Sequence, residues 1–254
     1  MSDRLTNLEQ ILTVVSQNPK DVPIETRKQF WKLVRQIKRT PRPDDQEVLR
    51  AAEIRDILFE ANRGKTYSLS LGLLVLTIPG LLCLWGYIWA LGTPLPWSGI
   101  LTWGFPNWMT FGIRLLFVFG VIAFLYPIGR VVAGKWLGIK LLGMCRDQYY
   151  EPTVKIDYVT FLKAPAGKRK WFFFFAGFWT FLTALWLWVL GMVLALDYTA
   201  LILTVILFLF EGGVILSGNP SATRGEMGHY NREKRIERTW KKNLVKLTES
   251  SDVA

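Results

Sequence analysis

Histidine and cysteine are nearly absent from this chain of 254 residues. It contains one histidine, His229, and two cysteines, Cys83 and Cys145. Zinc and haem sites are built mainly from imidazole and clustered thiolate ligands, so we expect no metal or haem cofactor. Cys83 lies in an apolar run, Cys145 lies in a basic segment, and no Cys-x-x-Cys pair occurs, so we predict no structural disulfide. We expect His229 to be a surface residue.

Lysine and arginine are missing from one part of the chain and concentrated in others. Residues 92–110 contain none, whereas 1–66 contain 13, 130–170 contain nine and 217–254 contain eight, for a net charge of +11. We expect no nucleic-acid binding, because no recognition motif accompanies the basic charge. The positive-inside rule predicts that both termini and residues 130–170 are cytoplasmic, facing anionic lipid headgroups. The first 66 residues are polar, so we expect no signal peptide.

Long apolar runs are the strongest positive feature of the sequence. Hydrophobic residues make up 51% of the chain, and the mean hydropathy is +0.23. Runs of about 20 apolar residues are long enough to cross a bilayer as helices. The sequence therefore predicts an all-α integral membrane protein, which we place in a bacterial or archaeal cytoplasmic membrane, with a four-span domain over 67–216. The predicted spans are 67–91, 111–129, 171–196 and 198–216.

The segments outside the spans carry their own patterns. Residues 1–66 show three apolar stripes at helical spacing, which predicts a cytoplasmic helical segment. Residues 217–254 predict a basic tail helix that either lies on anionic lipid or packs on the N-terminal helices. Its narrow apolar stripe consists of Ile236, Trp240, Leu244 and Leu247.

Within the cytoplasmic loop 130–170, two short stretches have strand character. Residues 138–144 can extend as a short strand, and 153–158 alternate so that Val154, Ile156 and Tyr158 share a face. Residues 146–152 between them supply a polar turn. We predict a β-hairpin against the membrane face.

Aromatic and basic residues are expected to anchor the spans at the two interfaces. Three tryptophans occur in the uncharged segment 92–110, where amphipathic rings are typical of the headgroup level. Three basic residues precede the third span and are expected to anchor it at the inner interface. These anchors are Trp97, Trp103 and Trp108 at the outer side and Lys168, Arg169 and Lys170 at the inner side.

Charged side chains near membrane depth are the candidate functional residues. Arg114 lies about one turn below the outer interface, where we expect it to extend its charge to the headgroups. Glu211 lies five residues before the inner end of the fourth span, and Arg130 lies at the inner end of the second. We therefore predict an Arg130–Glu211 ion pair that joins these two spans; a proton-carrying Glu211 is the alternative.

The stretch Tyr126-Pro127-Ile128-Gly129-Arg130, followed by Ala133, Leu137, Gly138 and Ile139, resembles the active-site helix of site-two-protease-like zinc metalloproteases. The resemblance covers roughly residues 115–165 and includes the predicted hairpin. That family carries His-Glu-x-x-His where this chain has Tyr126, Pro127 and Arg130. Arginine offers no lone pair to zinc. The family's later Asn-Pro…Asp-Gly segment is matched by Asn219-Pro220 and Arg224-Gly225, without the carboxylate. The resemblance implies an inactive relative in which Arg130 replaces the charge of the metal.

Three functions follow from these patterns. The first is a non-catalytic accessory, assembly or scaffold subunit of a membrane complex, whose aromatic outer loop and basic inner face contact membrane protein partners or lipid. The second is an inactive site-two-protease-like protein that binds membrane protein clients. A small transporter ranks last, because the sequence has neither paired polar spans nor an internal repeat.

Overall fold

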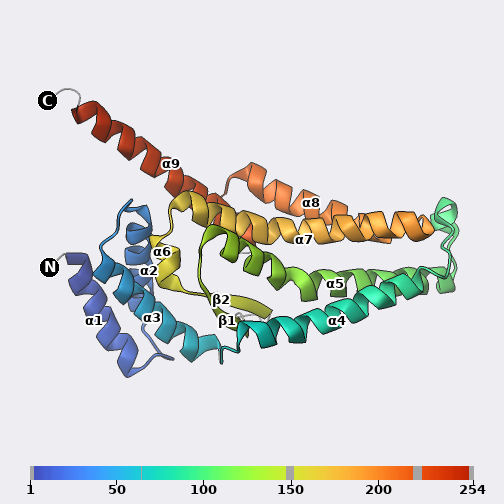
Figure 1. The fold of residues 1–254 in the computed structure, drawn as a ribbon, viewed down its shortest axis with the longest axis horizontal. Coiled ribbons are helices and arrows are strands. Elements are labelled where there is room, and N and C mark those ends of the chain that lie inside the picture. The colour runs from blue at the N-terminus through green and yellow to red at the C-terminus, as the bar shows by residue number, and fades with distance from the viewer. Residues whose placement is uncertain (1–2, 64, 147–151, 220–224, 252–254) are drawn as a thin grey trace.

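Four long apolar helices form the body of the protein and confirm the prediction of an all-α membrane protein. The computed structural model describes residues 3–63, 65–146, 152–219 and 225–251. Four of its helices are long and apolar enough to cross a membrane, and α4, α5 and α7 run side by side (Figure 1). These helices are α4 (Leu69–Ala90), α5 (Phe105–Leu137), α7 (Ala166–Ala195) and α8 (Thr199–Ser217).

Local sequence sets the ends of these helices. Ser68 caps α4 by accepting a hydrogen bond from the Leu71 amide, and Pro106 lies in the first turn of α5, where its missing N–H costs nothing. α5 ends at Gly138, whose φ of +73° is readily adopted only by glycine. The second span was predicted to stop at residue 129, but the helix continues past Arg130 to Leu137. Arg130 is therefore an interior helical residue.

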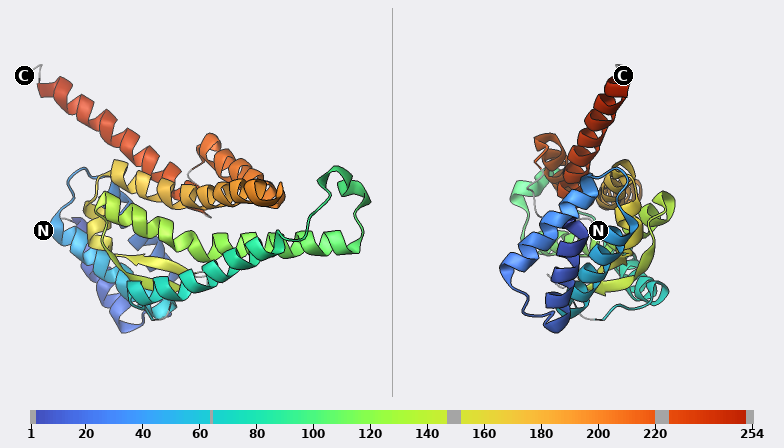
Figure 2. Two further views of the ribbon diagram at one scale, coloured as in Figure 1. Left: turned by 45° about the vertical axis from the view of Figure 1, so that its right-hand side comes forward. Right: turned by 90° about the vertical axis from the view of Figure 1, so that its left-hand side faces the viewer.

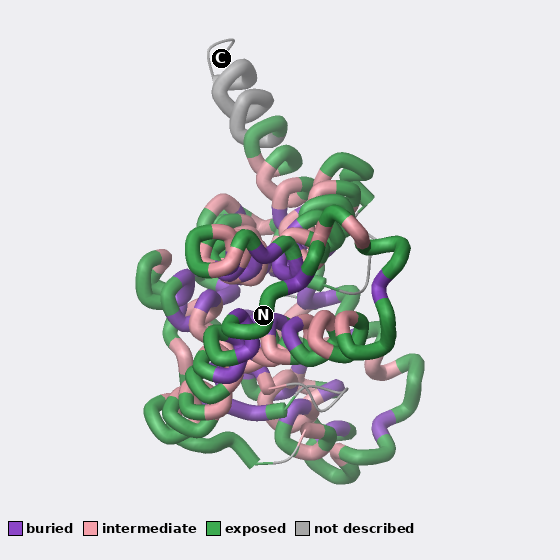
Figure 3. Tube along the Cα trace, turned by 90° about the vertical axis from the view of Figure 1, so that its right-hand side faces the viewer, coloured by how far each residue is buried: buried purple, intermediate pink, exposed green. Residues whose placement is uncertain are grey.

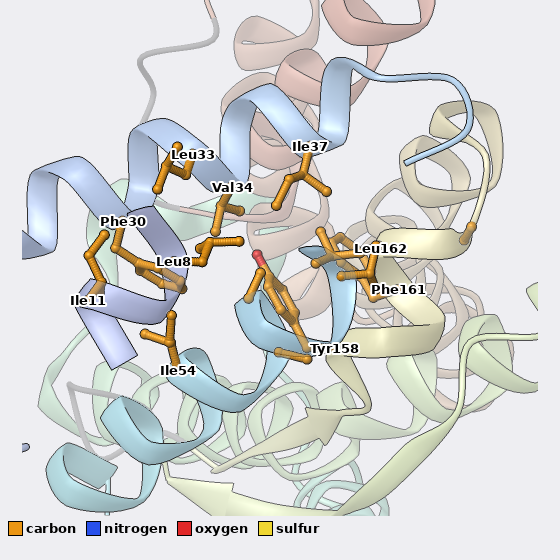
Figure 4. Close-up of a cluster of buried hydrophobic side chains, with 14 of the residues drawn as sticks. Leu8, Ile11, Phe30, Leu33, Val34, Ile37, Ile54, Tyr158, Phe161 and Leu162 are labelled. Atoms are coloured by element: carbon orange, nitrogen blue, oxygen red, sulfur yellow. The ribbon is translucent and has the colours of Figure 1, made fainter. Parts of the chain in front are cut away.

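The N-terminal segment consists of α1 (Asp3–Gln17), α2 (Ile24–Arg39) and α3 (Asp45–Arg63), which lie together at one end of the bundle. Their apolar stripes pack on each other and on the short helix α6 (Tyr158–Lys163), so one core joins the segment to the loop before α7 (Figure 4). The buried side chains of this core include Leu8, Ile11, Phe30, Val34, Ile37, Ile54, Phe161 and Leu162.

The predicted β-hairpin is present. β1 (Leu141–Arg146) pairs antiparallel with β2 (Pro152–Ile156), with Met144 opposite Val154; most of the predicted turn, 147–151, lies outside the described residues. Three consecutive residues of β2 are buried, so the predicted alternation fails: Val154 packs against α4 and α5, while Lys155 forms an ion pair with Glu60 of α3. Tyr158 begins α6 and does not continue the strand, because Asp157 caps that helix.

The segment between α4 and α5, which contains the 3₁₀ helix η1 (Trp97–Thr102), lies at the opposite end of the bundle (Figure 2), and its aromatic residues pack together. The three tryptophans expected to be separate interfacial anchors pack edge to face on one another: Trp97 lies 5.2 Å from Trp103, and Trp103 lies 5.2 Å from Trp108. Trp103 is buried and donates its indole N–H to the Pro96 carbonyl, whereas Trp108 remains exposed.

Candidate functional site along helix α9

The C-terminal helix α9 (Glu226–Ser251) is fastened to the body of the protein by one of its faces. Glu226, Glu233 and Glu237 are separated by seven and four residues, which places them on the same side of a helix. Each forms an ion pair with basic residues of other elements. We call these three glutamates, with the residues bonded to them, the α9 seam.

The first contact of the seam is the Arg130–Glu226 pair between α5 and α9. Arg130 Nε donates to Glu226 Oε1 at 2.7 Å, Tyr126 donates its hydroxyl to the same oxygen, and Arg130 Nη1 donates to Thr153 of β2. Glu226 is only 4% exposed. Burial by itself raises the pKa of Glu226, but the charge of Arg130, with the hydrogen bonds from Arg130 and Tyr126, outweighs it, so the pKa is lowered and the carboxylate stays ionised.

The predicted Arg130–Glu211 pair is therefore wrong: the partner of Arg130 is Glu226. The described residues contain no basic side chain paired with Glu211, and its Oε2 is buried without a hydrogen-bond partner there. The prediction failed because Glu226 lies 96 residues beyond Arg130, in a tail helix that was expected to lie on lipid or on the N-terminal helices and not against α5. The spacing of the three glutamates on a strongly basic helix was the signal that could have revealed a docked acidic face.

The second contact joins α2, α7 and α9 around Glu233. Lys38 Nζ and Arg169 Nε each lie 2.7 Å from a different oxygen of Glu233. Arg169, predicted to anchor the third span at the interface, is instead 0% exposed, and its remaining N–H groups donate to the carbonyls of Leu162, Ala164 and Lys38. Burial raises the pKa of Glu233, but Lys38 and Arg169 lower it by more.

The other two predicted basic anchors differ from each other. Lys170 pairs with Glu237 at 2.6 Å and forms the third contact of the seam, whereas Lys168 is exposed.

Close approach of α9 to α7 supports the seam. A Cβ added to Gly177 of α7 would lie 2.7 Å from Met227 Cε and 3.2 Å from Glu226 Cβ, so a side chain at this position would force both residues of α9 to shift. His229, expected at the surface, stacks on Phe173 at 4.7 Å, and Arg232 donates to its Nδ1. Burial first, and then the positive charge of Arg232, lower the pKa of His229 to about 4.

A separate buried cluster closes the aromatic end of the bundle. Arg114 is 1% exposed and pairs with Asp197 in the turn between α7 and α8, so the expectation that it extends to the headgroups is wrong. Tyr87 of α4 and Thr199 of α8 donate hydroxyl hydrogen bonds of 3.0 Å to the same carboxylate. The guanidinium also donates to the carbonyls of Ala90 and Thr93. Arg114 is thus a structural cation that joins the helix ends.

The chemistry available at the α9 seam is the pairing of fixed charges. Two of the positions that resemble the metalloprotease motif, Tyr126 and Arg130, converge on one carboxylate. The other two differ: Pro127 is buried within α5, and Gly129 lies against the ring of Trp179. Within the described ranges, no three His, Cys, Asp or Glu residues lie together as a metal site would need. Pro220 and Arg224 of the later matched segment lie outside those ranges.

No protein-family model, curated protein or solved structure matches this chain.

Proposed function

We propose that this protein is a non-catalytic accessory, assembly or scaffold subunit of a membrane complex, and that α9 is its partner-binding element. The supporting observation is the separation of charge on α9. Its acidic residues at 226, 233 and 237 face the body of the protein in ion pairs, while every charged side chain that the structure describes as exposed on this helix is basic. These exposed residues are Arg235, Arg238, Lys241 and Lys242.

The position of α9 supports this role. The helix starts against α7 and α8, contacts α2, and then extends away from the rest of the chain (Figures 1 and 3). A helix held at one end by buried ion pairs presents its other end in a defined direction, which reduces the ordering cost of binding. A cluster of exposed basic residues favours an acidic partner and accelerates encounter with it. We therefore infer a membrane protein partner that carries an acidic segment.

We propose that α9, the N-terminal helices and the hairpin lie on the cytoplasmic side of a bacterial or archaeal cytoplasmic membrane. These elements share one end of the bundle and hold most of the lysines and arginines, whereas segment 92–110 at the other end has none. A reporter fused near Trp103 should be extracytoplasmic. A cytoplasmic reporter would overturn this topology.

Co-purification in mild detergent tests the subunit proposal. The tagged chain should retain a stoichiometric partner, and reversing three exposed charges of α9 (R235E/R238E/K242E) should release it. The matched control K20E/K32E/R42E reverses three exposed charges of the N-terminal segment and should retain the partner. Equal loss from both variants would show general charge attraction and contradict the assignment to α9.

The inactive protease-like protein remains the second candidate, supported by the convergence of Tyr126 and Arg130 on Glu226. In that reading, a guanidinium occupies the place of a metal at the inner end of α5. Co-purification separates the two proposals, because a pseudo-protease would capture varied single-span clients transiently, whereas a subunit would hold one partner in fixed ratio.

A further inference from the structure

A cleft lies between the membrane-spanning helices α5 and α7. It encloses about 220 Å³ and is lined by one face of α5 from Gly129 to Trp136 and one face of α7 from Phe175 to Leu182. All its lining residues are apolar, four of them aromatic. The absence of a side chain at Gly129 lets the Trp179 side chain approach α5 closely, since a Cβ there would lie 2.5 Å from Trp179 Cβ.

Aromatic rings form the rim of this cleft toward the basic end of the bundle. Trp136 lies 4.7 Å from Phe175, and Trp171 lies 5.7 Å from the same ring. Trp136 is 68% exposed and Trp171 40% exposed. Exposed tryptophans at the end of a membrane helix are typical of the headgroup level.

Lys168 lies beyond that rim, on the same face of α7 as the residues that line the cleft. Residues 168, 171, 175, 178 and 182 of α7 are spaced by three or four positions and so share a face. Lys168 is exposed and forms no ion pair with another described residue. The neighbouring basic residues Arg169 and Lys170 are both used by the α9 seam.

The distance along α7 from Lys168 to the cleft matches the distance from the phosphate of a phospholipid to its acyl chains. At the helical rise, Phe175 lies about 10 Å below Lys168, and Leu182 about 10 Å below Phe175. A leaflet has roughly 15 Å of hydrocarbon beneath about 6 Å of headgroup region. A phosphate at Lys168 therefore places the acyl chains at the depth of the cleft.

We propose that the α5–α7 cleft binds one acyl chain of an anionic phospholipid, whose phosphate pairs with Lys168. An ammonium that has no ion-pair partner among the described residues favours an anionic headgroup over a zwitterionic one. A partner helix fits this surface less well, because membrane helices pack through small residues and this rim consists of bulky rings.

Native mass spectrometry of the purified full chain with added phosphatidylglycerol or phosphatidylcholine tests the site. The chain should bind one phosphatidylglycerol more tightly than phosphatidylcholine. Lys168→Gln should weaken phosphatidylglycerol binding about fivefold, the effect of roughly one lysine–lipid contact. Val132→Trp, which fills the cleft, should weaken both lipids.

Matched controls separate this site from general lipid attraction. Lys140→Gln removes an exposed lysine that lines a different hollow, and Ile206→Trp adds a ring to the exposed face of α8. Both should bind phosphatidylglycerol like the unmodified chain, and circular dichroism should confirm helicity in each variant. Equal binding by Lys168→Gln and the unmodified chain would overturn the headgroup contact. Undiminished binding by a folded Val132→Trp would overturn the acyl-chain site.

Discussion

Replacing Arg130 by glutamine should be among the most destabilising single changes in this protein. The guanidinium bonds to Glu226 through two nitrogens and to Thr153 through the third. Its loss leaves the carboxylate of Glu226, which is only 4% exposed, with the Tyr126 hydroxyl as its hydrogen-bond donor. Removing one partner of a buried ion pair costs about 3–5 kcal/mol. We expect a loss of that size in the free energy of unfolding.

A double-mutant cycle identifies the partner as well as the cost. In reversible SDS unfolding from detergent micelles, Arg130→Gln and Glu226→Gln should show a coupling energy of about 2 kcal/mol, because one interaction is lost in both single variants. Arg130→Gln combined with Glu211→Gln should show coupling below about 0.5 kcal/mol. Strong coupling to Glu211 with none to Glu226 would refute the structural assignment and restore the pair expected from sequence.

Three further changes probe other contacts. Asp197→Ala should cost about 3–5 kcal/mol because it leaves Arg114 buried without a counter-charge, and thermal aggregation in detergent measures the loss; a melting temperature like that of the unmodified chain would contradict the pair. Gly177→Val should separate α9 from α7 and speed trypsin cleavage within α9, whereas Gly112→Val, whose Cβ meets open space, should not. The pKa of His229 is about 4 in the folded chain, against about 6.5 unfolded, so stability should be complete above pH 6.5 and fall by up to about 3 kcal/mol toward pH 4. His229→Gln should therefore reduce the pH dependence of the free energy of unfolding between pH 4 and 6.5. An unchanged pH dependence in this variant would show that other groups cause it.

Much of the helical architecture could be predicted from sequence because it depends on local physics. Runs of about 20 apolar residues can satisfy their backbone groups in lipid only as helices, so each predicted span corresponds to one of the four apolar helices. The strand pair was also foreseeable, since a short extendable stretch and an alternating stretch flank a polar turn. The ends of the helices were harder to predict. α5 continues past Arg130 because a charged residue does not break a helix, and it ends only before Gly138.

The partners of the buried charges could not be predicted in this way. Arg114, Arg130 and Arg169 each stand near an end of a span, where sequence reasoning assigns a charge to the interface. The structure buries Arg114 and Arg169 and pairs each of the three with a carboxylate between 64 and 96 residues away. Sequence by itself determined that these charges need water, lipid headgroups or a counter-charge, because an isolated charge is costly in an apolar interior. Only the tertiary structure decided that each charge is met by a carboxylate, because the turn at Asp197 and the packing of α9 against the bundle bring carboxylates to positions that no local pattern specifies.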